Sequence, residues 1–126
     1  MVRDIAAMKD KTPLVDQNTS LKDTLLVITE KKLGVALISD KKKIVGIFTD
    51  GDLRRCLNNG INIDNTKIKE VMTANFKSIE SNALAIDAAA IMESNKILSL
   101  VVNSSHKSPD GAGVITMHQL LEAGII

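Results

Sequence analysis

An internal duplication is the feature that most constrains how this 126-residue chain can fold. The stretch IVGIFTDGDL at residues 44–53 is echoed by GAGVITMHQL at residues 111–120, with a glycine, a threonine and a leucine at the same spacing. Such self-similarity indicates one supersecondary unit used twice. We therefore predict two copies, at residues 1–62 and 63–126.

Each copy has the pattern of a β-α-β-β-α unit, so the predicted fold class is α/β, with small mixed sheets covered by helices. One copy buries too little apolar surface to be stable alone, and we expect the two to pack through their sheets as one body. The expected elements are extended pieces near 14–15 and 78–79, strands at 35–39, 44–48, 98–103 and 112–115, and helices beginning at Thr49 and Thr116.

A further amphipathic helix is expected in each copy between the extended piece and the first long strand. Ser20 and Asn82 stand near the expected N-cap positions, and Gly34 suits a left-handed residue after the first of these helices. The second copy carries an insertion within 103–111, where the first has a short polar turn at 40–43. Polar turns are the usual place for such a change in length.

The composition argues against several classes of protein. Lys and Arg total 16 against 15 Asp and Glu, and there is no Tyr or Trp. A nucleic-acid partner is therefore not expected, because neither a basic excess nor stacking side chains are present. No apolar run suggests a membrane span or a secretory signal. The single cysteine, Cys56, excludes an internal disulfide and favours a cytoplasmic setting with a buried structural thiol. We expect no metal and no cofactor.

The strongest local motif is Thr49-Asp50-Gly51-Asp52, where a strand gives way to a helix. Free N–H groups and the helix dipole favour an anion there, and Asp52 could accept hydrogen bonds from sugar hydroxyls. Gly46 allows a close approach to the backbone. The alternative is purely structural: Thr-x-x-Asp is a variant of the capping box, and so is the Thr-x-x-Gln of the second copy. The residues alone leave both interpretations open.

The repeated unit resembles the CBS motif, and two in tandem resemble a Bateman module. The resemblance rests on residues 45–53 and 113–121 and covers nearly the whole chain. It implies a cleft that binds adenine nucleotides or other phosphorylated effectors, with the threonine and aspartate of the motif on phosphate and ribose. The ligand-binding residues that we infer are Thr12, Pro13, Val15, Gly34, Val35, Ala36, Thr49, Asp50, Asp52, Arg54, Thr116, His118 and Gln119.

A more specific resemblance is to the C-terminal half of the arabinose 5-phosphate isomerases. It is carried by residues 46–55 and by the ending at 118–126. The catalytic part of those enzymes is an N-terminal sugar-isomerase domain for which this chain has no room. The resemblance therefore implies a non-catalytic regulatory tail whose effector is a nucleotide, a sugar phosphate or a CMP-Kdo-like nucleotide sugar. No nucleophile and base stand together in a motif, which agrees with the absence of catalysis.

The two copies differ where the ligand is expected. Gln119 replaces Asp52, and Lys77 replaces Pro13, so we predict one dominant site at Thr49 and Asp52. Arg54 and Arg55 are candidates to neutralise a phosphate, with a solvated helix face or an ion pair between subunits as the equal alternative. His118 could meet an anion or be a partly exposed first-turn residue.

Two other functions remain open from the sequence. The chain could be a ligand-free oligomerisation module, forming a homodimer through a helix face such as Leu84, Ala88, Ile91 and Met92. It could also be a free-standing regulator of another enzyme or transporter.

Overall fold

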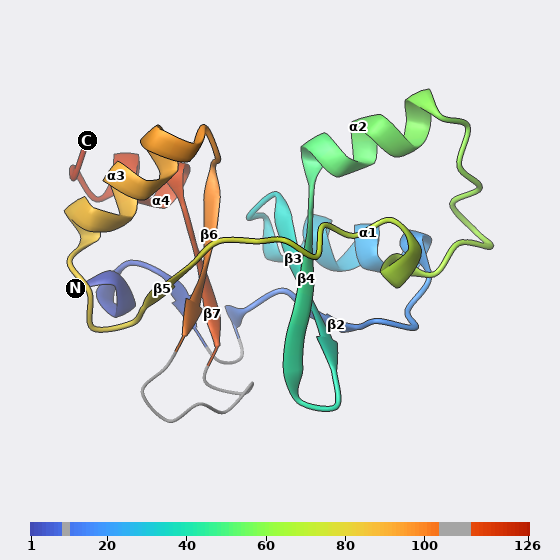
Figure 1. Ribbon diagram of the computed structural model, residues 1–126, viewed down its shortest axis with the longest axis horizontal. Helices are drawn as coiled ribbons and strands as arrows, with labels where there is room; N and C mark the ends of the chain where they lie inside the picture. The colour runs from blue at the N-terminus through green and yellow to red at the C-terminus, as the bar shows by residue number, and fades with distance from the viewer. Residues whose placement is uncertain (9–10, 104–111) are drawn as a thin grey trace. The chain divides into compact units, whose positions relative to one another are not determined.

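Both predicted β-α-β-β-α copies are present in the computed structural model of the chain, which describes residues 1–8, 11–103 and 112–126 (Figure 1). Most of the insertion expected within 103–111 therefore lies outside the described residues. In chain order the elements are η1 (Val2–Asp4), β1 (Ala7–Met8), β2 (Leu14–Asp16), α1 (Leu21–Lys31), β3 (Val35–Asp40), β4 (Lys43–Thr49), α2 (Asp50–Asn58), η3 (Ile68–Glu70), β5 (Ser78–Glu80), α3 (Ala85–Asn95), β6 (Ser99–Asn103), β7 (Gly113–Thr116) and α4 (Met117–Glu122).

These elements form two compact units. The central unit comprises residues 13–76, and the terminal unit comprises residues 1–12 together with 77–126. The units therefore differ from the predicted copies at 1–62 and 63–126, because the opening segment of each copy packs with the body of the other.

Backbone hydrogen bonds give the physical reason for this exchange. In the terminal unit the N–H of Val2 donates to the carbonyl of Ala83 at 2.8 Å, and β1 pairs with β7. In the central unit the N–H of Ile68 donates to the carbonyl of Thr19 at 2.7 Å. The repeat period marks the two copies, but these pairings decide which segment completes each unit.

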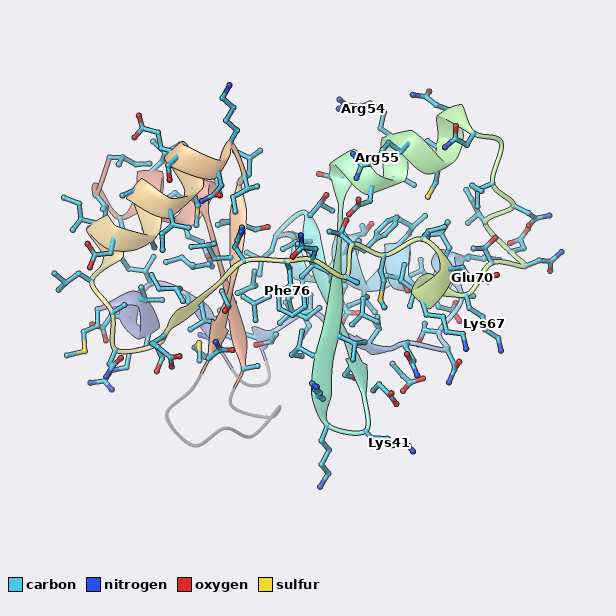
Figure 2. All side chains as sticks on the ribbon, viewed as in Figure 1. Lys41, Arg54, Arg55, Lys67, Glu70 and Phe76 are labelled. Carbon is cyan, nitrogen blue, oxygen red and sulfur yellow. The ribbon has the colours of Figure 1, made fainter. Side chains whose placement is uncertain are left out.

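The two sheets have equivalent mixed topologies. The central sheet has the order β2-β3-β4, and the terminal sheet has the order β1-β7-β6-β5. In each, a short strand runs parallel to a longer one, which then pairs antiparallel with the strand that leads into the last helix. The turn between β3 and β4 has Lys41 and Lys42 at φ 48° and 67°, the geometry of a type I′ hairpin. Figure 2 shows Lys41 at its tip.

Helix α1 begins as predicted, with Ser20 as N-cap accepting from the N–H of Asp23 at 3.1 Å. It buries Leu21 and Ile28 in the core of the central unit. The left-handed residue that ends the helix is Lys32, and Gly34 also takes a positive φ of 71°. The positive φ predicted for Gly34 is therefore confirmed, although Lys32 is the C-cap.

The prediction of an apolar face on α3 is wrong in part. Ala88 and Met92 are fully buried in the terminal unit's own core, whereas Leu84 is the N-cap and is 58% exposed. Asn82, expected near the N-cap, lies before it. Because its central residues already pack inside one unit, this face as a whole is not free for a second chain.

No helix among the described residues is long and apolar enough to cross a membrane.

Candidate functional site

The N-terminus of α2 brings together several of the predicted ligand residues within the central unit. Strand β4 ends at Thr49, which pairs with Val35 at the start of β3. A Cβ atom built on Gly34 would lie 3.2 Å from Oδ2 of Asp50, so the absent side chain leaves room for that carboxylate. The sheet pairing thus places the start of β3 beside the start of α2.

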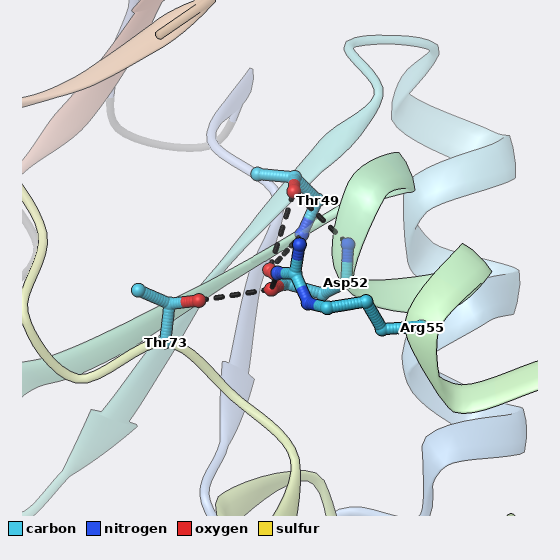
Figure 3. A network of polar contacts seen from close by, with 4 residues as sticks. All are labelled: Thr49, Asp52, Arg55 and Thr73. Carbon is cyan, nitrogen blue, oxygen red and sulfur yellow. Dashed lines mark hydrogen bonds and ion pairs between the residues drawn. The ribbon is translucent and has the colours of Figure 1, made fainter. Parts of the chain in front are cut away.

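Thr49 and Asp52 form the capping box that the sequence left as an alternative (Figure 3). The backbone N–H of Thr49 donates to Oδ2 of Asp52 at 2.9 Å, and the N–H of Asp52 donates to the Thr49 hydroxyl oxygen at 3.4 Å. The Thr49 hydroxyl also lies 3.2 Å from Oδ2. Thr116 and Gln119 form the equivalent box at α4. A structural role for the motif is therefore confirmed in both copies.

Asp52 has two partners beyond the box. The hydroxyl of Thr73 donates to its Oδ1 at 2.9 Å, and the Arg55 guanidinium forms an ion pair with the same oxygen. The residue is only 4% exposed, so its carboxylate oxygens meet these donors in place of water. Capping explains the contacts with Thr49, but it does not require those with Thr73 and Arg55.

The arginine in this network is Arg55, whereas only Arg54 of the two phosphate candidates was included among the inferred ligand-binding residues. Both lie on α2 and are exposed, and Arg55 is the one that pairs with Asp52 (Figure 3). Helical spacing could have distinguished Arg55 from Arg54. Positions 52 and 55 are three apart and share a helix face, whereas positions 54 and 55 are adjacent and do not. Thr73 comes from a segment distant in sequence, and no local signal connected it with Asp52.

Among the inferred ligand-binding residues that precede Thr49, five are buried: Thr12, Pro13, Val15, Val35 and Ala36. Pro13, Val15 and Ala36 belong to the central unit, where Val15 and Ala36 are buried in the hydrophobic core. Their side chains are therefore occupied by packing, and their backbone groups alone could meet a ligand. Thr12 belongs to the terminal unit, where its hydroxyl lies 3.2 Å from the Ala112 carbonyl oxygen.

The equivalent residues of the terminal unit have fewer polar contacts. Oε1 of Gln119 accepts from the N–H of Thr116 at 2.9 Å. His118 is exposed, and its Nε2 lies 2.8 Å from Oε1 of Glu122 on the same helix. Over residues 1–8, 11–103 and 112–126, no three His, Cys, Asp or Glu side chains are grouped as a metal site would require.

Gly46 allows the expected close approach to the backbone, and the group that approaches belongs to the chain itself. A Cβ at this position would lie 2.5 Å from Sδ of Met72 and 3.1 Å from the carbonyl oxygen of Thr73. The missing side chain therefore admits the chain's own segment at 72–73. That segment bridges to β4, because Ile47 and Thr73 exchange backbone hydrogen bonds of 2.9 and 2.8 Å.

Cys56 is the buried thiol that was expected, 5% exposed and part of the central core. Burial is the main cause that raises the pKa of this thiol, and the charge of Asp52 adds to it, while Arg55 opposes it. A raised pKa means that the folded chain favours the protonated Cys56 thiol. The stabilisation that follows is complete when the pH is below the ordinary thiol pKa. It is lost as the pH rises through the folded value.

Alkylation of Cys56 should therefore be much slower in the native chain than in the unfolded one. The pH at which the native rate rises should also be higher, since the thiolate is the nucleophile. Iodoacetamide labelling followed by mass spectrometry, with and without urea, measures both effects. Equal rates in the two states would contradict the burial of this side chain.

Comparison with known proteins places these observations in a family. The model of the CBS domain matches residues 2–59 and again residues 68–125. The chain is 42% identical over 126 residues to arabinose 5-phosphate isomerase KdsD of Yersinia pestis, and equally so to KdsD of Pseudomonas aeruginosa. Each alignment covers 99% of this chain and 38% of the relative, so the chain spans well under half of the curated relatives it matches.

Solved structures agree on the fold. A CBS domain protein of Pyrobaculum aerophilum, complexed with AMP, superposes with a TM-score of 0.80 at 14% identity, covering 99% of this chain and 98% of that one. A CBS domain pair in complex with 5′-methylthioadenosine and S-adenosyl-L-methionine gives a TM-score of 0.81 at 21% identity, covering 98% of each chain. Two family matches, the duplicated fold and the paired capping boxes agree: this chain belongs to the CBS domain family and is a tandem CBS pair.

Proposed function

We propose that this CBS pair is the effector-sensing regulatory part of an arabinose 5-phosphate isomerase-like enzyme. Its effector would be a nucleotide, a sugar phosphate or a nucleotide sugar such as CMP-Kdo, bound at the start of α2 in the central unit. The observation that carries the proposal is the pairing of a hydroxyl and a buried carboxylate, Thr49 and Asp52, at a helix N-terminus. The relatives at 42% identity support the enzyme class, and neighbours of the same fold bind AMP or adenosine derivatives.

The local chemistry suits a phosphorylated ligand. Early N–H groups of a helix lack intrahelical acceptors, and Gly51 presents no side chain in front of them. Asp50 and Asp52 are balanced by Arg54 and Arg55 within the first turns of α2. A phosphate would therefore approach a helix start whose nearby side chains carry no net negative charge, and Arg54 is free of the Asp52 network to reach it.

The first test compares two matched threonine variants of the full chain. Thr49→Ala and Thr116→Ala each remove an N-cap hydroxyl, and each should cost about 1 kcal/mol of stability. Only Thr49→Ala should also weaken ligand binding, by about tenfold for one lost hydrogen bond. Calorimetric titration with AMP, CMP, CMP-Kdo and arabinose 5-phosphate should show binding of one of them, with one dominant site per chain.

Two results would count against the proposal. One is that none of the four compounds binds the unmodified chain. The other is that Thr116→Ala weakens binding as much as Thr49→Ala, which would point to a loss of stability rather than a lost contact.

A further inference from the structure

We propose that Thr73 is a positioning residue for the ligand site, because it orients the Asp52 carboxylate and so gives the central unit its preference for ligands with a free sugar hydroxyl. This inference rests on the function proposed above and extends it to a residue outside the motif. Four donors surround Asp52, and they are divided between its two carboxylate oxygens.

Oδ2 of Asp52 is held by its own helix start. It accepts the backbone N–H of Thr49 and lies within hydrogen-bond distance of the Thr49 hydroxyl. Oδ1 points to the other side, where it meets Thr73 and Arg55 (Figure 3). A carboxylate offers about four lone-pair positions, so these partners fill it in the ligand-free chain. A ligand hydroxyl must therefore replace one of them.

The two partners of Oδ1 differ in how firmly they are held. The Arg55 side chain is 68% exposed, and holding such an ion pair stabilises the chain little. Thr73 is half-buried, and both its N–H and its carbonyl are bonded to Ile47. Arg55 is thus the partner that a ligand hydroxyl displaces, whereas Thr73 stays and keeps Oδ1 turned toward the ligand.

The terminal unit supplies an internal comparison. Ala7 pairs with Val114 in β7 as Thr73 pairs with Ile47 in β4, so Ala7 stands at the position of Thr73. Gln119 stands at the position of Asp52. The hydroxyl donor and the charged acceptor are therefore both present in one unit and both replaced in the other. The presence of both residues in the same unit is expected if Thr73 and Asp52 act together. Helix capping alone does not require Thr73.

The experiment uses the full chain and three variants. Thr73→Val removes the hydroxyl at nearly constant shape, and Thr73→Ser restores it. The matched control is Thr24→Val, because the hydroxyl of Thr24 also donates a hydrogen bond of 2.9 Å, but to the carbonyl of Ser20, the N-cap of α1. The probes are AMP and CMP together with their 2′-deoxy and 3′-deoxy forms.

Thr73→Val should weaken binding of the ribonucleotide about tenfold. It should change binding little for the deoxy form that lacks the hydroxyl received by Asp52. Thr73→Ser and Thr24→Val should bind like the unmodified chain. Binding of every probe weakened equally by Thr73→Val, or not weakened at all, would overturn the positioning role while leaving the proposed function intact. If the unmodified chain binds none of the probes, the proposed function fails for nucleotides and this inference fails with it.

A double-mutant cycle with Asp52→Ala gives a readout that needs no ligand. If Thr73 acts through Asp52, the unfolding equilibrium should change about tenfold less on Thr73→Val in the Asp52→Ala background than in the unmodified chain. Additive effects would show that the two side chains do not interact in solution, and the proposal would be wrong.

Discussion

Asp52→Ala is expected to lower the free energy of unfolding by about 2–3 kcal/mol and to abolish effector binding. The change removes the acceptor for the N–H of Thr49 and leaves the Thr73 hydroxyl without its partner. Loss of an N-terminal cap costs about 1 kcal/mol, and a buried hydrogen bond to a charged group adds more. Arg55 contributes little to this loss because its side chain is mostly exposed.

Gln119→Ala is the matched control for this prediction. Gln119 fills the same place in the second capping box and accepts the N–H of Thr116. Its loss should cost only about 1 kcal/mol, because the Thr73 position is occupied there by Ala7. Urea denaturation followed by circular dichroism suits a chain without Trp or Tyr, and hydrogen exchange of the α2 amides assigns the loss to the central unit. Equal losses of stability in the two variants would show that Asp52 stabilises the chain only as a helix cap.

Gly113→Ala should destabilise the chain more than Gly46→Ala, by about 3 kcal/mol against about 1 kcal/mol. A Cβ on Gly113 would collide with the backbone carbonyl of Ala7 as well as with the Met8 side chain, so β1 would have to move. At Gly46 the nearest atoms belong to the flexible side chain of Met72, which can turn aside.

Gly51→Ala is the control for the glycine pair. The nearest atom to a Cβ at this position would be 3.7 Å away, and the residue lies in α2, where alanine is the better helix former. This variant should be neutral or stabilising by up to about 1 kcal/mol. Melting curves of the three variants test the order. A cost at Gly51 similar to that at Gly113 would mean that backbone entropy, and not close approach, dominates.

Much of the fold could be predicted from the sequence, because its signals are local. The repeated glycine and threonine marked two copies, short apolar runs marked the strands, and Ser20 and Thr49 marked helix starts. These features depend on residues a few positions apart, which backbone geometry brings together wherever the rest of the chain lies. The same locality explains why the sequence could not choose between a capping box and a ligand site at Thr49.

The sequence predicted helix α3 less well, because packing and not the spacing of apolar residues decided which face is buried. On α3 the predicted face included Leu84, which instead became an exposed N-cap, while the core took up Ala88 and Met92. Three consecutive alanines at 88–90 give almost no contrast between faces, so the register of the buried stripe was decided by the sheet beneath.

By itself, the sequence determined that one β-α-β-β-α unit occurs twice and that the copies differ at Asp52 and Gln119. The tertiary structure alone decided which opening segment completes each unit, and therefore which residue meets Asp52. Thr73 reaches that carboxylate from 21 positions along the chain, because Gly46 admits the segment and Ile47 bonds it in place. Contacts of this kind depend on the path of the backbone through space, which no spacing of residue types encodes.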